Sequence, residues 1–325
     1  MQQIVTNPAP KISVIVPAYN TAGLIAGCLS SVLSQTCQDF EILIVNDGSS
    51  DTPELEGALE PYAARIRYIK QENKRAAGAR NSAIGIARGE FVAFLDSDDR
   101  WLPEHLSAQM DLVAKDPSLD MVYANAMLIG NPERQREFMQ ECPSNGVANF
   151  ESLIMEQCQI PVSTVVVRKS ALVKAGLFDE TLLRCDDYDM WVRAAFYGAK
   201  IGYSRKVQAL LNDGRTGSLG ASKFRMVEAY WMILEKTQDI LPLDQTQRGL
   251  VRQRATEIKS RSKYEQAKCE LGDGHFGSAI RLLSEANQQW RKTKLTITLA
   301  GLKIAPGLTW KVWSFWGRLR AGRAA

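Results

Sequence analysis

Short apolar runs alternate with helical segments along the first third of the chain. The runs ISVIVP (12–17), EILIVND (41–47), IRYI (66–69) and FVAFL (91–95) are predicted strands. The segments that follow them carry helical spacing or helix-terminus residues, which predicts helices over 22–34, 53–63, 76–88 and 102–114. Gly89 follows the third of these helices and is its expected C-cap. Continuous apolar strands that alternate with helices indicate a parallel sheet covered on both faces.

After residue 95 the pattern becomes mixed and then helical. Residues 121–129 and 160–167 look like strands, Ser170 is a candidate cap of a short helix, and 187–198 has helical spacing. Beyond about residue 222 nearly all of the chain is predicted helix. We therefore expect three regions, namely an α/β domain over 1–221, a helical extension over 222–290 and a basic tail over 291–325.

The composition is that of an ordinary globular protein. The chain has 325 residues, 45% hydrophobic and 23% charged, and can bury a sizeable core. Its six cysteines are scattered without a CxxC pair, which favours a reducing, cytoplasmic setting. The first residues lack the pattern of a secretory signal, and no apolar run approaches the roughly 18 residues of a spanning helix. We therefore expect a cytoplasmic protein without a transmembrane segment.

Positive charge is concentrated in the last part of the chain. The formal net charge is +4, yet residues 291–325 carry eight lysines and arginines and no acidic residue. Within them, residues 295–320 mix aliphatic side chains and three tryptophans with the basic residues, and Pro306 and Gly307 divide this stretch in two. The three tryptophans are Trp310, Trp313 and Trp316.

This mixture predicts peripheral binding to an anionic membrane surface, on the inner face of the cytoplasmic membrane, because tryptophan favours the interface and basic side chains favour anionic headgroups. The alternative is a C-terminal helical hairpin packed on the catalytic domain with a solvated basic edge. Nucleic acid is the weaker candidate partner, because acidic motifs dominate the other predicted loops.

Three aspartates directly follow the strand 91–95, and Asp47 ends the strand 41–47. Ligands of open α/β sheets bind beyond the carboxyl ends of strands. Asp96 and Asp98 are one residue apart, so in an extended segment both carboxylates point the same way and offer hard oxygen ligands to Mg²⁺ or Mn²⁺. Such a cation would relieve their repulsion and bind a diphosphate. Alternatively, the cluster is only a turn and a helix cap.

Phosphate-binding glycine motifs are absent from the chain. The first strand leads into PAYNTAG, which is not a GxGxxG sequence, and no Walker A sequence occurs. A phosphate-binding device in this protein is therefore expected to be a metal ion.

Five motifs, taken together, give a more specific prediction. SVIVPAYN (13–20), EILIVNDGSSD (41–51), GARNSAI (78–84), GEFVAFLDSDD (89–99) and DDYDMWVRAAFYG (186–198) have the order and spacing of family 2 glycosyltransferases. The chain closely resembles this family over about residues 11–215. The resemblance implies a GT-A fold with a mixed, mainly parallel sheet. It also implies transfer of a sugar, with inversion, from a nucleotide diphosphate to an acceptor hydroxyl.

The resemblance also implies roles for individual residues of the donor site. Pro17, Ala18 and Tyr19 would line the base and ribose, Asp47 would accept a hydrogen bond from the base, and Arg80 would lie near the nucleotide and its phosphates. Asp98 would be the direct metal ligand, Asp96 would contact the ribose or the metal, and Ser97 between them would belong to the nucleotide site. Two of these motif residues have plain alternatives, because Asn20 could cap the following helix and Arg80 could be a surface residue.

Asp186 and Asp187 match the Glu-Asp pair that supplies the catalytic base in the family. Asp187 would take the proton of the attacking hydroxyl, and Asp186 would orient the acceptor or the backbone. Because both open a predicted helix, where the dipole favours carboxylates, a capping role is the alternative. Trp191 on the same helix is expected in the core.

The chain departs from the family pattern after the last sheet segment. The family often has an Arg-x-His-x-Gly-Ser loop there, whereas this chain reads LNDGRTGSLG (211–220), with Arg215 near the histidine position. Arg215 could neutralise phosphate charge. The two histidines, His105 and His275, are expected to be surface residues rather than metal ligands.

The sequence thus predicts a metal-dependent inverting hexosyltransferase that uses Mn²⁺ or Mg²⁺ and a nucleotide-sugar donor, most simply a UDP-sugar. The acceptor would be a glycan, lipid-linked or protein-linked, in polysaccharide, glycolipid or glycoprotein biosynthesis. A sugar-1-phosphate nucleotidyltransferase is disfavoured by the missing glycine-rich signature. A non-catalytic glycan-binding relative is disfavoured by the intact Asp47, Asp98 and Asp187.

Overall fold

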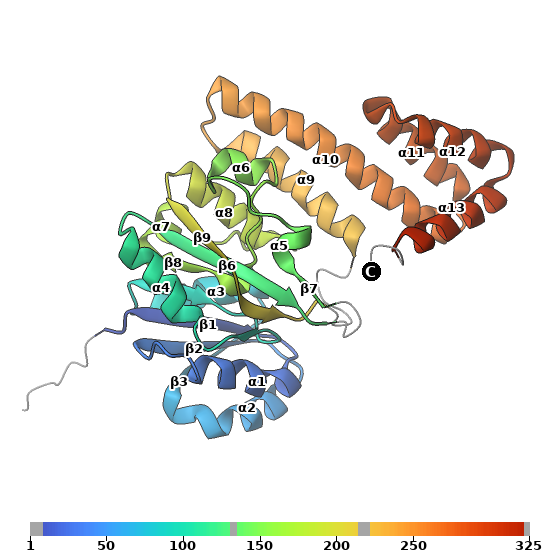
Figure 1. Ribbon diagram of the computed structural model, residues 1–325. Coiled ribbons are helices and arrows are strands. Elements are labelled where there is room, and N and C mark those ends of the chain that lie inside the picture. The colour runs from blue at the N-terminus through green and yellow to red at the C-terminus, as the bar shows by residue number, and fades with distance from the viewer. Residues whose placement is uncertain (1–8, 131–134, 214–221, 322–325) are drawn as a thin grey trace, which may run out of the picture. The chain divides into compact units, whose positions relative to one another are not determined.

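The computed structural model describes residues 9–130, 135–213 and 222–321 (Figure 1). The chain divides into two units, Met1–Thr216 and Gly217–Ala325. The first is an α/β unit and the second is entirely helical in its described part.

The α/β unit is built on one mixed sheet with the strand order β3-β2-β1-β4-β8-β6-β9-β5, and β7 pairs with β6 at its side. The first half is parallel: β1 (Ile12–Ala18), β2 (Phe40–Asp47), β3 (Ile66–Gln71) and β4 (Phe91–Phe94). In the second half β8 (Val166–Arg168) is antiparallel to both neighbours, β4 and β6 (Met121–Leu128). The remaining strands are β9 (Ile201–Leu211), β5 (Arg100–Trp101) and β7 (Arg136–Glu137).

Helices cover both faces of this sheet. The main ones are α1 (Ala22–Leu33), α2 (Thr52–Leu59), α3 (Arg75–Ile86), α4 (His105–Lys115) and α8 (Asp186–Phe196), with short helices α5 (Phe138–Glu141), α6 (Phe150–Ile154) and α7 (Lys169–Lys174). Alternate residues of β1 join α1, α2 and α4 in one buried apolar cluster, whereas α3 packs against β1 and β2 outside it. The predicted mixed sheet with helices on both faces is therefore confirmed.

Three local predictions were wrong, each for a physical reason. Helix α3 ends at Ile86 with Ala87 as its C-cap, and Gly89 instead permits a close backbone approach, because a Cβ there would lie 2.6 Å from the amide nitrogen of Ser13. Ser170 lies inside α7, whose N-cap is Arg168. The predicted strand 160–167 is strand only at its end, since Val162–Thr164 forms a 3₁₀ turn before β8.

The helical unit consists of α9 (Lys223–Ile240), α10 (Gln245–Gly272), α11 (Phe276–Trp290), α12 (Thr293–Ile304) and α13 (Pro306–Ala321). Pro306 divides the tail as predicted. Leucines of α10, α11 and α12 form a buried cluster in which Leu271, Leu283 and Leu302 are almost fully covered. Among the described helices none is both long and apolar enough to cross a membrane.

Candidate functional site

The ends of β1 and β2 place the predicted base-binding residues. Ala18 is buried, and Tyr19, which follows it, is 50% exposed. The Asp47 carboxylate is almost fully buried, and its Oδ1 accepts hydrogen bonds from Gln71 Nε2 (2.7 Å) and from the backbone amide of Lys74 (2.8 Å). The chain itself therefore fixes Asp47 through one oxygen. The exposed ring and this fixed acidic group both come from the carboxyl ends of neighbouring parallel strands.

The loops after β1 and β2 hold each other in place. Asn20 has a left-handed backbone (φ 54°), and its Oδ1 accepts hydrogen bonds from the amide (2.8 Å) and the hydroxyl (3.0 Å) of Ser50. Asn20 therefore does not cap α1, whose N-cap is Thr21. The first amide of α1, that of Ala22, donates instead to Asp51 of the second loop (2.9 Å). These contacts fix the backbone next to Tyr19.

The aspartate cluster after β4 has two partly exposed carboxylates and one buried one. Asp96 and Asp98 are partly exposed, whereas Ser97 and Asp99 are buried. Asp99 is not the start of the next helix, which begins at His105. Its carboxylate accepts hydrogen bonds from Ser163 Oγ (2.5 Å) and from the backbone amide of Asn212 (2.8 Å). Burial, followed by the charge of Asp96, raises the pKa of Asp99 well above its ordinary value.

Ser163 is a site residue that the sequence pattern did not reveal. Its hydroxyl donates to Asp99 and accepts a hydrogen bond of 3.1 Å from the backbone amide of Asp96. Its carbonyl accepts a hydrogen bond of 2.6 Å from Trp101 Nε1. Ser163 thus ties both ends of the aspartate loop to the 3₁₀ turn before β8.

Arg80 connects the aspartate loop with the predicted catalytic pair. Its Nη2 donates to Asp96 Oδ1 (2.8 Å) and its Nη1 to Asp186 Oδ2 (2.6 Å). The side chain is only 4% exposed, which excludes the alternative that Arg80 is a surface residue. Burial alone would lower the pKa of Arg80, but Asp96, Asp186 and Asp187 raise it above its ordinary value, so the group stays charged. In this arrangement both terminal nitrogens bind carboxylates.

Asp186 and Asp187 open α8 after a residue in an unusual conformation. Cys185, the N-cap, has a left-handed backbone with φ 57°, which costs energy for a residue other than glycine and turns the chain sharply into the helix. Asp186 is buried beside Arg80, whereas Asp187 is partly exposed and accepts a hydrogen bond of 2.8 Å from the amide of Tyr188. Burial and the charge of Asp186 raise the pKa of Asp187 to about 7, although Arg80 opposes this shift.

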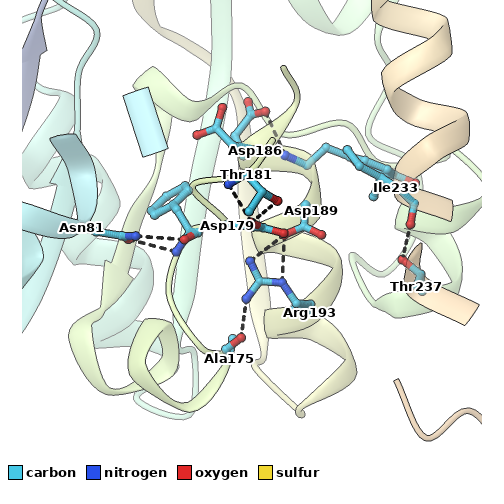
Figure 2. Close-up of polar contacts among 12 residues, drawn as sticks. Asn81, Ala175, Asp179, Thr181, Asp186, Asp189, Arg193, Ile233 and Thr237 are labelled. Carbon is cyan, nitrogen blue, oxygen red and sulfur yellow. Dashed lines mark hydrogen bonds and ion pairs between the residues drawn. The ribbon is translucent and has the colours of Figure 1, made fainter. Parts of the chain in front are cut away.

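Buried polar contacts hold α8 in position (Figure 2). Arg193 pairs with Asp189 one turn earlier (2.6 Å) and also donates to the carbonyl of Ala175. Asn81 of α3 exchanges hydrogen bonds of 2.9 Å and 3.0 Å with the backbone of Phe178, whose ring packs against Trp191 of α8. Trp191 is buried against Phe94 and Phe178, which confirms that it is a core residue.

The described residues thus bring together a half-exposed tyrosine ring beside a fixed aspartate, a carboxylate loop, and an acidic pair of which Asp187 is partly exposed. The sequence profile described as glycosyl transferase family 2 matches residues 13–180, more than half of the chain. The chain belongs to glycosyl transferase family 2. It is therefore a nucleotide-sugar-dependent glycosyltransferase.

Among curated relatives, the family 2 enzyme is similar to UDP-Glc:alpha-D-GlcNAc-diphosphoundecaprenol beta-1,3-glucosyltransferase WfgD of Escherichia coli. The two are 30% identical over 235 residues, which cover 69% of this chain and 85% of WfgD. Two other curated relatives, uncharacterized glycosyltransferases of Rickettsia felis and Rickettsia conorii, are longer, and the matched part of the chain spans only 31% of each.

Two solved structures share the fold of this glycosyltransferase. The mannosyltransferase PcManGT of Pyrobaculum calidifontis, in complex with GDP-Man and Mn²⁺, matches with a TM-score of 0.63 at 18% identity, over 94% of this chain and 84% of that chain. TarS 1-349 of S. aureus in complex with UDP-GlcNAc matches with a TM-score of 0.60 at 19% identity, over 92% of this chain and 89% of that chain. The predicted GT-A fold is therefore confirmed.

The ligand set available to a metal ion in this glycosyltransferase is small. Within the described residues no group of three His, Cys, Asp or Glu side chains is arranged to hold a cation. Mg²⁺ and similar ions are commonly held by one or two carboxylates together with the phosphates of a substrate. Asp96 and Asp98, both partly exposed, fit that kind of binding.

Three further predicted residues complete the comparison with the sequence. Arg215 lies outside the described residues. His275 is exposed, as predicted, with its side chain 66% accessible. His105 is fully buried against Trp101, so the prediction of a surface position is wrong.

Proposed function

We propose that this enzyme is a divalent-cation-dependent hexosyltransferase. It transfers a sugar from a UDP-sugar, with inversion, to a hydroxyl of a lipid-linked glycan acceptor in polysaccharide biosynthesis. The observation that carries the proposal is the double hydrogen bond of Arg80, which holds Asp96 of the donor loop and Asp186 of the acidic pair on one guanidinium. This contact supports placing the donor phosphates and the base in one site.

At the donor end, we assign the base and ribose to Pro17, Ala18, Tyr19 and Asp47. The half-exposed ring of Tyr19 offers a stacking surface, and Asp47 offers a fixed acceptor whose Oδ1 is already bonded within the protein. The choice of UDP rests on the printed substrates of WfgD and TarS, whereas PcManGT binds GDP-Man. The lipid-linked acceptor rests on the name of WfgD alone.

At the reacting end, we assign the metal to Asp98, with Asp96 and Ser97 beside it. When bound, the cation would offset negative charge on the leaving diphosphate. Asp96 already shares its charge with Arg80 and Asp99 is buried, whereas Asp98 is partly exposed. Together with the place of Asp98 in the family motif, this exposure supports Asp98 as the primary ligand.

We assign the base to Asp187. It would accept the acceptor's hydroxyl proton while the hydroxyl oxygen forms a bond to the anomeric carbon and the bond from that carbon to the diphosphate breaks. A pKa of about 7 suits this role, because the carboxylate is largely ionised just above neutral pH and still basic enough to take a proton. Asp186, held by Arg80, would keep the pair in place rather than take the proton.

The decisive experiment replaces Asp187 with asparagine. We expect Asp187→Asn to reduce transfer by about 10²–10⁴-fold, the range for loss of a general base, while Mn²⁺ and UDP still raise the melting temperature. Asp116→Asn, which removes an exposed acidic group after α4, is the matched control and should leave transfer unchanged. Undiminished transfer by Asp187→Asn would refute the assignment of the base.

A screen of nucleoside diphosphates tests the donor site separately. We expect UDP to stabilise the protein against heat in the presence of Mn²⁺ and much less after chelation of the metal. Asp98→Asn should weaken the metal-dependent part of this shift without removing the contribution of the base. If no nucleoside diphosphate stabilises the protein with or without metal, the proposal of a nucleotide-sugar site fails.

A further inference from the structure

The last two helices expose large aliphatic side chains. On α12, Ile297 is 67% and Ile304 is 84% exposed, and on α13, Leu308 is 67% and Val312 is 49% exposed. We call these four side chains the outer aliphatic face. Single exposed aliphatic side chains are common on protein surfaces, whereas a patch of them marks a contact with a partner.

The outer aliphatic face lies opposite the side on which the two helices are buried. On α12, Leu299 and Leu302 point into the cluster with α10 and α11, and Ile297 and Ile304, two turns apart, lie about half a turn away from them. On α13, Trp310 and Trp313 pack into the same cluster, whereas Leu308 and Val312 lie on another side of the helix. Both aliphatic pairs therefore point away from the shared core.

Close packing makes the two helices one surface. A Cβ at Gly301 of α12 would lie 2.9 Å from Thr309 Oγ1 of α13, so the helices touch with almost no space between them. The two helices therefore pack against each other, and we treat their four exposed aliphatic side chains as one ridge.

Trp310 and Trp313 do not have the surface position that the sequence predicted. Trp310 and Trp313 are partly buried and stack edge-to-face at 5.7 Å, and Trp313 also contacts Tyr264 of α10 at 6.0 Å between ring centroids. They stabilise the helical unit and are not free anchors at its surface. The apolar surface is made instead by the isoleucines, leucine and valine.

The charge around this ridge identifies the occupant. Residues 291–325 contain eight basic residues and no acidic one, and Lys294 and Lys303 of α12 are exposed beside the aliphatic side chains. A second copy docked on the same face would bring two basic surfaces together. A nucleic acid would use the charge but leave the four aliphatic side chains in water. An anionic lipid surface matches both the charge and the apolar ridge.

We propose that the outer aliphatic face of α12 and α13, together with Lys294 and Lys303, binds the surface of an anionic phospholipid bilayer. The helices would lie in the headgroup region, with the aliphatic side chains toward the acyl chains and the lysines toward the phosphates. Binding needs both contributions, because a few basic residues or a few aliphatic side chains alone give only weak, reversible attachment. The proposal does not depend on the donor, metal or acceptor assigned above.

Co-sedimentation of the full chain with vesicles tests the proposal without any donor or metal. We expect binding to vesicles of phosphatidylcholine mixed with phosphatidylglycerol, little binding to phosphatidylcholine alone, and weaker binding at high salt. The double variant Ile304→Ser/Leu308→Ser keeps the charge and should bind at least about tenfold more weakly, since each change removes a buried aliphatic side chain from the contact. Met232→Ser on α9 makes a comparable change at an exposed residue elsewhere and should bind as the wild type does.

Two outcomes would overturn the proposal. One is that the wild-type chain binds neither kind of vesicle. If that chain instead retards a DNA duplex in a gel-shift assay, the partner of this face is nucleic acid. The other is that the double variant binds anionic vesicles as tightly as the wild type, which would leave only non-specific charge attraction. Because the double variant changes exposed residues, its circular dichroism and its transfer to a soluble acceptor should match those of the wild type. The Asp187→Asn variant should lose transfer but still bind anionic vesicles, so a failure of the membrane proposal can be told apart from a failure of the catalytic one.

Discussion

Arg80 donates a hydrogen bond of 2.6 Å to Asp186, a residue 106 positions further along the chain. The same guanidinium bonds Asp96 at 2.8 Å. Arg80 comes from α3, Asp96 from the loop after β4 and Asp186 from the first turn of α8, so three elements meet at one buried cation. The position of the acidic pair relative to the aspartate loop therefore depends on Arg80.

The first prediction concerns the stability that this cation provides. In Arg80→Gln the mostly buried Asp186 loses its cationic partner, and we expect a loss of about 3 kcal/mol in the free energy of unfolding. Arg80→Lys keeps the charge but cannot bond both carboxylates in the same fork, so its loss should be intermediate. Urea unfolding at neutral pH measures both. Equal stability of Arg80→Gln and wild type would show that the pair does not stabilise the fold.

The second prediction concerns pH. Asp187 must be ionised to accept a proton, and its pKa is raised to about 7, so kcat/KM should increase as the pH rises through about 7 and level off above it. In Asp186→Asn one like charge disappears and Arg80 is left with fewer acidic partners, and both effects lower the pKa of Asp187. The midpoint of the profile should therefore move to lower pH. A wild-type midpoint near 4, or a midpoint that the variant does not move, would contradict the assignment.

The sequence predicted those parts of the site that depend on local pattern. Asp47 and Asp96 follow apolar runs, and Asp187 opens a helical pattern, so each could be placed at the end of a strand or the start of a helix. Ser163 gave no such signal, because IPVSTVVV reads only as an apolar strand and its contact with Asp96 depends on β8 pairing with β4. The burial of Asp99 and of Arg80 likewise depends on segments far away in the sequence.

The third prediction tests Ser163 as a positioning residue for the aspartate loop. Ser163→Ala leaves the amide of Asp96 and a carboxylate oxygen of Asp99 without their present partner, at a cost of about 1–3 kcal/mol. We expect KM for the donor at fixed Mn²⁺ to rise about tenfold with a smaller change in kcat. Ser170→Ala, at an exposed serine of α7, is the control and should change neither constant.

A double-mutant cycle separates positioning from a general loss of structure. Because Ser163 and Asp99 share one hydrogen bond, the effects of Ser163→Ala and Asp99→Asn on donor KM should not add. Fully additive effects, or a fall in kcat with donor KM unchanged, would rule out a positioning role through this bond.

The fourth prediction concerns a buried histidine outside the site. His105 is fully buried and stacks on Trp101 with 4.4 Å between ring centroids, and within the described structure neither of its ring nitrogens has a hydrogen-bond partner. Burial lowers the pKa of His105 to about 3, below the 6.5 of a free histidine. The unfolded chain therefore binds a proton below pH 6.5 that the folded chain does not, and stability is lost as the pH falls from 6.5 toward 3.

At pH 5 this single group should reduce the free energy of unfolding by about 2 kcal/mol relative to pH 7. His105→Phe keeps an aromatic ring on Trp101 and removes the titrating group, so the variant should lose that much less stability between pH 7 and pH 5. Comparing the variant with the wild type cancels the contributions that the other titratable groups, including Asp187, make to the pH dependence of stability, because these groups are the same in both proteins. If urea unfolding shows the same pH dependence for both proteins, the pKa of His105 in the folded protein is not lowered, and the prediction is wrong.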